Sequence, residues 1–218
     1  FRDKHRAPID IHLVEGLENV FPNNDPVVQA KLRKLLEAKD IEIHTGEFIG
    51  EVDDETVYVG EEKELDYDVL LWTGGITGQD AAETVAVEKD DRSNRIEAAS
   101  NFQTSDERVF SIGDAALIEQ PGQDQPAPPT AQAAWQAAEV VGENIARSVR
   151  GQPLKEWEYD DKGTLISVGE KAVAHDVKGL PIDTFGGPAA KALKKTVAAR
   201  WINTVTGFGD AAKAFPDM

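Results

Sequence analysis

Two short segments near the middle of the chain contain residue types that suit the binding of a cofactor. The first is Gly113-Asp114, which directly follows the apolar run at residues 109–112. If this run is a buried strand, it delivers the pair to the carboxyl edge of a sheet, where α/β folds bind ligands. The glycine would let a ligand approach the backbone, and the Asp114 carboxylate could accept hydrogen bonds from hydroxyl groups. Strand ends of this kind also occur without any ligand.

The second segment is the start of an alanine-rich helix. Its first turn comprises Thr130, Ala131, Gln132 and Ala133. A helix start presents N–H groups and the positive end of the helix dipole, and small side chains leave the approach open. This arrangement suits a flat ring with carbonyl oxygens. The alternative is that alanine serves here only as a good helix former.

Two glutamines of the same helix are spaced for a shared task. Gln132 and Gln136 are four residues apart, so both amides lie on one helix face and could point into one cavity. Each amide can donate and accept a hydrogen bond, which fits the carbonyl of a quinone bound beside a flavin. Two solvent-facing glutamines are the alternative.

Nearer the start of the chain, Glu15 closes a run of strand-like residues and is followed by a glycine. An acid at the carboxyl end of the second strand of a nucleotide-binding βαβ unit can bind the two hydroxyls of an adenosine ribose. A carboxylate here favours NADH, because it would repel the 2′-phosphate of NADPH. Gly74 and Gly75 follow another strand-like run at 67–72 and could let the backbone approach NADH, or form a plain loop. The fingerprint G-x-G-x-x-G would precede residue 1.

The composition excludes several classes of protein. Forty acidic and 23 basic residues give a formal charge of −17, which argues against nucleic-acid binding and resembles proteins of a halophile's high-salt cytoplasm. With no cysteine, the chain has no disulfide, thiolate metal site or redox dithiol. The four histidines have no metal-ligand spacing, so we expect no metal site. No apolar run is long enough for a membrane span.

The hydrophobic pattern predicts an α/β fold with a small antiparallel excursion. The predicted strands lie at residues 9–15, 41–44, 47–52, 56–59, 67–72, 109–112, 163–169 and 171–174, and the predicted helices at 26–39, 130–150 and 186–203.

The last predicted helix reverses the charge of the rest of the chain. Its charged side chains are all basic, namely Lys191, Lys194, Lys195 and Arg200. Its bulky apolar residues recur every four positions, at Leu193, Val197, Trp201 and Val205. A basic helix with an apolar stripe suits an anionic membrane surface. Alternatively, the helix packs on the core or on a second copy of the chain in a homodimer.

Taken in order, these segments resemble the type II NADH dehydrogenases, single-subunit NADH:quinone oxidoreductases with a disulfide-reductase-like flavoprotein fold. The resemblance is carried by residues 12–16, 70–75, 109–116, 130–136 and 165–174. It implies a Rossmann-like α/β fragment of a two-dinucleotide-binding-domain flavoprotein, covering about its carboxyl-terminal half. Residues 1–75 would belong to the NADH-binding domain, 76–151 to the returning part of the FAD-binding domain, and 152–218 to a small α+β module with the membrane-associating helix.

The resemblance also implies a mechanism, in which hydride passes from NADH to flavin N5 and two electrons then reduce a quinone without proton pumping. Gly113, Asp114 and the helix start at residues 130–133 would hold FAD, Glu15 with Gly74 and Gly75 would hold NADH, and Gln132 and Gln136 would face the quinone. The enzyme would be a peripheral protein of the respiratory chain on the cytoplasmic face of the cell membrane.

Three alternatives remain open at this stage. A sulfide:quinone oxidoreductase shares the fold, but its usual mechanism needs cysteines. A soluble NADH-dependent ferredoxin or disulfide reductase has no need of the basic tail. A non-catalytic nucleotide-binding module is the third. Because the first FAD-binding βαβ unit is outside these 218 residues, we expect the chain alone to bind FAD weakly or not at all.

Overall fold

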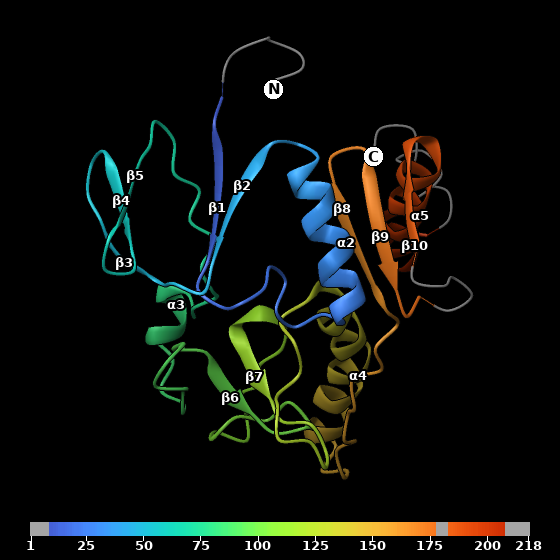
Figure 1. The fold of residues 1–218 in the computed structure, drawn as a ribbon. Helices are drawn as coiled ribbons and strands as arrows, with labels where there is room; N and C mark the ends of the chain where they lie inside the picture. Colours follow the sequence, from blue (N-terminus) through green and yellow to red (C-terminus); the bar gives the residue numbers. More distant parts are fainter. Residues whose placement is uncertain (1–8, 178–182, 208–218) are drawn as a thin grey trace. The chain divides into compact units, whose positions relative to one another are not determined.

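The computed structural model describes residues 9–177 and 183–207, which form two compact units (Figure 1). The first unit comprises Phe1–Leu70 together with Gly163–Met218, and the second comprises Leu71–Lys162. The architecture is mixed α/β, as predicted. The division into three functional domains expected from the resemblance stays a prediction.

The first unit is built on a parallel strand pair joined by a helix. Strands β1 (Ile11–Glu15) and β2 (Ile41–Thr45) pair in parallel, and α2 (Pro26–Glu37) connects them. The Asp25 side chain caps α2 by accepting a hydrogen bond from the N–H of Val27 at 2.8 Å, and Pro26 occupies the first turn, where no N–H is needed. The predicted strand–helix–strand order is confirmed.

Helix α2 is the centre of the core of the first unit. It packs on β2 and on two strands from much later in the chain, β8 (Thr164–Val168) and β9 (Lys171–His175). Leu32 is completely buried, and Val173 of β9 belongs to the same apolar cluster. Strand β9 lies between β8 and β10 (Asp183–Gly186) in an antiparallel sheet, and α5 (Gly187–Thr206) follows. The strands and the helix predicted after residue 162 are therefore present, and the structure groups them with the first 70 residues.

An antiparallel three-stranded sheet also belongs to the first unit. It comprises β3 (Ile49–Val52), β4 (Thr56–Val59) and β5 (Lys63–Asp66), of which β5 was not predicted. Asp53 closes the first turn, because one carboxylate oxygen accepts hydrogen bonds from the backbone N–H groups of residues 55 and 56. These bonds and one from the Tyr58 hydroxyl lower the pKa of Asp53.

The predicted strand at residues 67–72 is wrong. The chain forms no helix or strand between residues 67 and 79, and the side chains of Val69, Leu71 and Trp72 are 78%, 83% and 61% exposed. A strand needs a neighbour for its backbone N–H and C=O groups, and no strand in the described ranges pairs with this segment. An apolar run of this kind therefore forms a strand only where another strand pairs with it, and the described residues contain no such strand.

The second unit contains the other parallel pair, β6 (Ile96–Ala98) and β7 (Ala116–Ile118), with helices α3 (Asp80–Glu83) and α4 (Ala131–Val149). The predicted strand at residues 109–112 is also wrong, since Phe110 makes only an isolated bridge with Gln103 and the regular strand begins after the Gly-Asp turn. The long helix was predicted almost to its ends, and Gly151 follows it with φ +63°.

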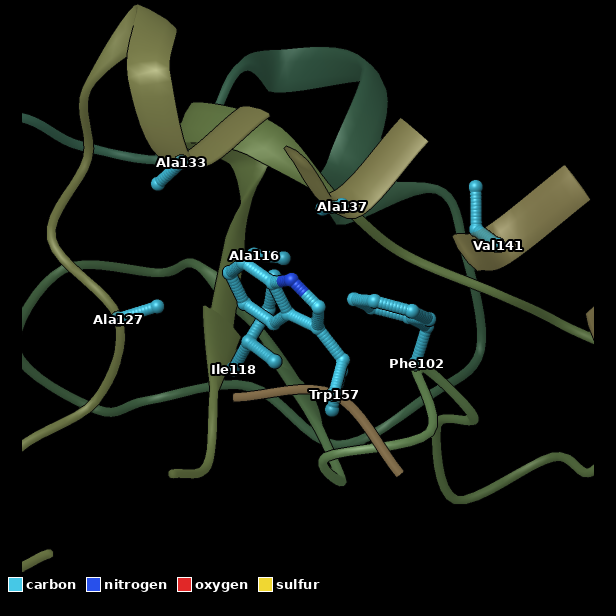
Figure 2. Close-up of a cluster of buried hydrophobic side chains, with 9 residues drawn as sticks. Phe102, Ala116, Ile118, Ala127, Ala133, Ala137, Val141 and Trp157 are labelled. Carbon is cyan, nitrogen blue, oxygen red and sulfur yellow. The ribbon is translucent and has the colours of Figure 1, made fainter. Parts of the chain in front are cut away.

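A compact aromatic core supports this unit (Figure 2). The rings of Phe102 and Trp157 lie side by side with centroids 5.4 Å apart, and Ala116 and Ile118 of β7 face the indole. Helix α4 contributes one face, on which Ala137 is fully buried. Small residues on this face of α4 therefore leave room for the two aromatic rings.

One polar side chain in this core joins three segments. Asn144 of α4 is fully buried, and its amide donates to the carbonyl oxygens of Asn101 at 3.1 Å and Lys155 at 2.8 Å. Its carbonyl oxygen accepts from the N–H of Lys155 at 2.9 Å. Two of these three hydrogen bonds hold the backbone of Lys155, which is two residues before Trp157.

Replacing Asn144 by alanine should lower the free energy of unfolding by about 2–4 kcal/mol, because it removes three hydrogen bonds made by a fully buried side chain. Urea unfolding followed by tryptophan fluorescence measures this loss. The control is Glu139→Ala on the exposed face of the same helix, which should change the unfolding free energy by at most about 0.5 kcal/mol. Equal effects of the two variants would contradict the role given to Asn144.

Candidate functional site

The Gly-Asp turn and the start of α4 lie together in the second unit. Residues Gly113–Ala115 form a single 3-10 turn, η1, which contacts α4. Gly113 has φ +70°, a conformation that favours glycine, and a Cβ placed on it would lie 3.7 Å from the Cβ of Ala134. The two segments that the sequence singled out therefore form one surface.

Asp114 presents its side chain at this surface. Its carboxylate is exposed, whereas its backbone oxygen accepts a hydrogen bond from Nε of Arg95 at 2.8 Å. The same guanidinium donates to the backbone oxygen of Ala116. Arg95 thus bonds the backbone of the turn at Asp114 and of the first β7 residue, Ala116, and these bonds do not use the Asp114 carboxylate.

Arg95 is a residue of this candidate site that the sequence analysis did not single out. It is only 6% exposed, and burial lowers the pKa of its guanidinium, while the charges of Asp114 and Asp90 act in the opposite direction. It stands in a polar stretch of sequence that resembles a surface loop, so nothing in its local pattern indicated burial. The fork of donors on a guanidinium suits two neighbouring carbonyl oxygens.

The first turn of α4 is capped from its own N-terminus. The Thr130 hydroxyl accepts a hydrogen bond from the N–H of Ala133 at 3.2 Å, and Ala133 packs into the apolar core. Ala131 is exposed and Gln132 is half-buried. Thr130 is therefore the cap of the helix rather than part of its first turn, and the cap uses the N–H of Ala133 that the sequence analysis left for a ligand.

Gln132 and Gln136 share a helix face, as predicted, and both bind the chain at residues 160–162. Gln132 Oε1 accepts from the N–H of Lys162 at 2.6 Å. The Gln136 amide donates to the backbone oxygen of Asp160 at 2.9 Å and accepts from its N–H at 3.1 Å. Both side chains therefore have structural partners, and their contact with a quinone stays a prediction.

Glu15 lies in the first unit at the carboxyl end of β1, where the sequence placed it. Its neighbour in register is Thr45, the last residue of β2, so both strands end at one edge. Glu15 Oε1 accepts from the N–H of Leu17 at 3.1 Å, which holds the carboxylate at the turn. Gly74 and Gly75 lie in the second unit, and Gly75 has φ +100°.

A hollow of about 550 Å³ lies elsewhere in the second unit, between α3 and the loop that precedes β6. Its lining carries the carboxylates of Asp80, Glu83, Asp90 and Asp91 and the ammonium of Lys89. An excess of carboxylates opposes an anionic dinucleotide. We therefore place the candidate cofactor site at the Gly-Asp turn.

The basic tail forms helix α5, as predicted. Val197 and Val205 are 58% and 62% exposed, Lys194 is exposed and Leu193 is half-buried, whereas the side chain of Trp201 lies outside the described residues. In the ranges 9–177 and 183–207, no helix combines the length and hydrophobicity needed to cross a bilayer.

Comparison with known proteins identifies the family of the chain. The family model for pyridine nucleotide-disulphide oxidoreductases matches residues 4–138. A type II NADH:quinone oxidoreductase of Staphylococcus aureus is 31% identical over 167 residues, which cover 76% of this chain and 39% of that protein. This chain therefore spans less than half the length of that relative.

Solved structures share the fold at lower identity. NDH2 from Plasmodium falciparum, solved with NADH, has a TM-score of 0.75 at 15% identity, covering 95% of this chain and 57% of that one. The sulfide:quinone oxidoreductase of Aquifex aeolicus has a TM-score of 0.66 at 14% identity, covering 91% and 51%. Since the family model matches more than half of the sequence, the chain belongs to the pyridine nucleotide-disulphide oxidoreductase family.

Proposed function

We propose that this chain is part of an FAD-dependent enzyme that oxidises NADH and passes two electrons to a membrane quinone. The observation that carries the proposal is the contact between the Gly113–Asp114 turn and the small-residue start of α4. The 31% sequence identity to a type II NADH:quinone oxidoreductase of Staphylococcus aureus supports the choice of reaction.

The residues at this turn fit FAD. The exposed Asp114 carboxylate can accept hydrogen bonds from ribityl hydroxyls, and Gly113 adds no side chain between the backbone and the cofactor. The exposed Ala131 at the start of α4 leaves room for a flat ring near the positive end of the helix. Bound FAD would supply the redox chemistry, and the protein positions it.

The proposed task of Glu15 is to bind the adenosine ribose of NADH. The hydrogen bond from Leu17 holds one carboxylate oxygen and leaves the other able to accept from the ribose. Thr45 ends the neighbouring strand at the same edge and offers a second polar side chain there. Gly74 and Gly75 are proposed to let the backbone approach NADH.

The quinone is proposed to bind near Gln132 and Gln136. An amide side chain can make up to four hydrogen bonds, and Gln136 makes two of them with the backbone of Asp160. By holding residues 160–162 against α4, the pair would also shape the wall of a quinone site. We propose a peripheral location on an anionic membrane surface, supported by the exposed Val197 and Val205 beside basic residues of α5.

The uncovered apolar segment at residues 69–72 bears on the same proposal. Its exposed side chains require a partner, and the relative from Staphylococcus aureus is more than twice as long as the matched region. We propose that this segment packs on further parts of the FAD-binding domain in the complete enzyme, which would also complete the flavin site.

A sulfide:quinone oxidoreductase is the second candidate, because such an enzyme shares the fold. The 218 residues contain no cysteine, whereas the usual sulfide chemistry needs cysteines in the active site. NADH is therefore the favoured electron donor.

The reaction is tested with the intact protein, including any sequence that flanks these 218 residues. We expect a yellow flavin spectrum and NADH oxidation that a soluble quinone accelerates. Sulfide in place of NADH should give no quinone reduction. Failure of quinone to accelerate NADH oxidation would overturn the proposal, and sulfide-driven turnover would select the second candidate.

The ribose assignment predicts that Glu15→Ala raises KM for NADH about 10-fold or more, since a charge-assisted hydrogen bond contributes about 1.5–3 kcal/mol. The preference for NADH over NADPH should fall as well. Asp10→Ala is the control, because Asp10 is an exposed acid at the opposite end of β1. An unchanged KM in Glu15→Ala, or an equal change in both variants, would show that Glu15 does not bind the ribose.

The flavin assignment predicts that Asp114→Asn raises the Kd for FAD about 10-fold or more, because the carboxylate is a stronger acceptor than an amide. Fluorescence titration of the apoprotein with FAD measures this. Asp124→Asn replaces another exposed acid of the same unit and should leave the Kd unchanged. Equal Kd values for Asp114→Asn and the unmodified protein would place FAD away from the turn.

A further inference from the structure

Two histidines that are far apart in the sequence lie together on the β1–β2 pair. His12 of β1 is opposite Glu42 of β2, and His44 is two residues further along β2. Side chains two residues apart on a strand point to the same face, so all three share one face of the pair. The two histidines have no metal-ligand spacing in the sequence, and the parallel register of β1 and β2 brings them together.

The three side chains converge on a small volume. His12 Nδ1 lies 3.0 Å from His44 Nε2. The two carboxylate oxygens of Glu42 lie 3.6 Å from these nitrogens, one from each. One potential ligand atom from each residue falls within 4.8 Å of the other two. The rings are stacked, with centroids 5.3 Å apart and planes inclined by 18°.

These distances match the edges of a coordination tetrahedron. Zinc binds imidazole nitrogen and carboxylate oxygen at about 2.0–2.1 Å, so neighbouring ligands of a tetrahedral site lie about 3.3 Å apart. The observed separations of 3.0 and 3.6 Å bracket this value. Two imidazoles and one carboxylate leave the fourth position open to water.

This cluster differs from an ordinary group of surface acids because one of its side chains is buried. The side chain of His44 is only 7% exposed, that of His12 is 31% exposed and that of Glu42 is 66% exposed. One ligand is thus fixed in the structure, and a path from solvent remains through Glu42. We propose that His12, Glu42 and His44 bind a divalent transition-metal ion of the zinc class, a site independent of the redox reaction.

The one opposing contact also supplies a test. Lys63 of β5 lies with Nζ 2.7 Å from His44 Nδ1. A metal on Nε2 requires the proton of the neutral imidazole to be on Nδ1, which an ammonium cannot accept. Lys63 is exposed and can move away, and a carboxylate in its place would accept this proton and strengthen the site, as outer-shell carboxylates do.

The experiment titrates the intact protein with Co²⁺ and Zn²⁺ in a background of Mg²⁺ and high salt, which occupies surface carboxylates. We expect one Co²⁺ per chain with the visible absorption bands of a tetrahedral complex, displaced by Zn²⁺. His12→Gln and His44→Ala should each weaken binding about 100-fold or more, since even outer-shell changes cost about 10–100-fold. Lys63→Glu should strengthen it about 10-fold.

His175→Ala is the matched control. His175 also lies on a strand, and its Nε2 is 3.3 Å from a carboxylate oxygen of Asp176. It does not belong to the cluster of His12, Glu42 and His44. It should keep the affinity and the spectrum of the unmodified protein. Absence of tetrahedral Co²⁺ bands would overturn the proposal, as would an equal loss in His12→Gln and His175→Ala. Lys63→Glu is at an exposed position, so weaker binding in that variant would also count against the site.

Discussion

The contact between the Gly113–Asp114 turn and α4 depends on the small residues that both segments place there. Gly113 adopts φ +70°, and a Cβ placed on it would lie 3.7 Å from the Cβ of Ala134, so two small residues meet where the turn contacts α4. Arg95 bonds the backbone oxygens of Asp114 and Ala116, and the Asp114 side chain remains exposed. A larger residue on either side would separate the two segments, and the surface proposed for FAD would be lost.

The aromatic core behind this surface explains why it can be rigid. Trp157 and Phe102 fill the space under α4, and Asn144 fixes the backbone that carries the tryptophan. Gln132 and Gln136 extend the same attachment along the helix to residues 160–162. The helix therefore has a buried side that organises the second unit, and its start, where Ala131 is exposed, is where we propose that FAD binds.

Sequence reasoning succeeded where hydrophobic periodicity and capping act locally. It predicted α2 and α4 almost to their ends, where the structure shows Asp25 and Thr130 as caps and Gly151 after α4. It failed where an element depends on a distant partner, as at residues 67–72. Arg95 and the pairing of His12 with His44 could not be predicted, because their neighbours are set by the tertiary fold and by strand register rather than by spacing.

The central claim is that Asp114 and the start of α4 form part of a flavin site. A crystal structure of the intact protein with FAD bound tests it most directly. The account predicts a ribityl hydroxyl within about 2.5–3.2 Å of the Asp114 carboxylate and the isoalloxazine ring over the first turn of α4. FAD bound elsewhere, with Asp114 still facing solvent, would contradict it.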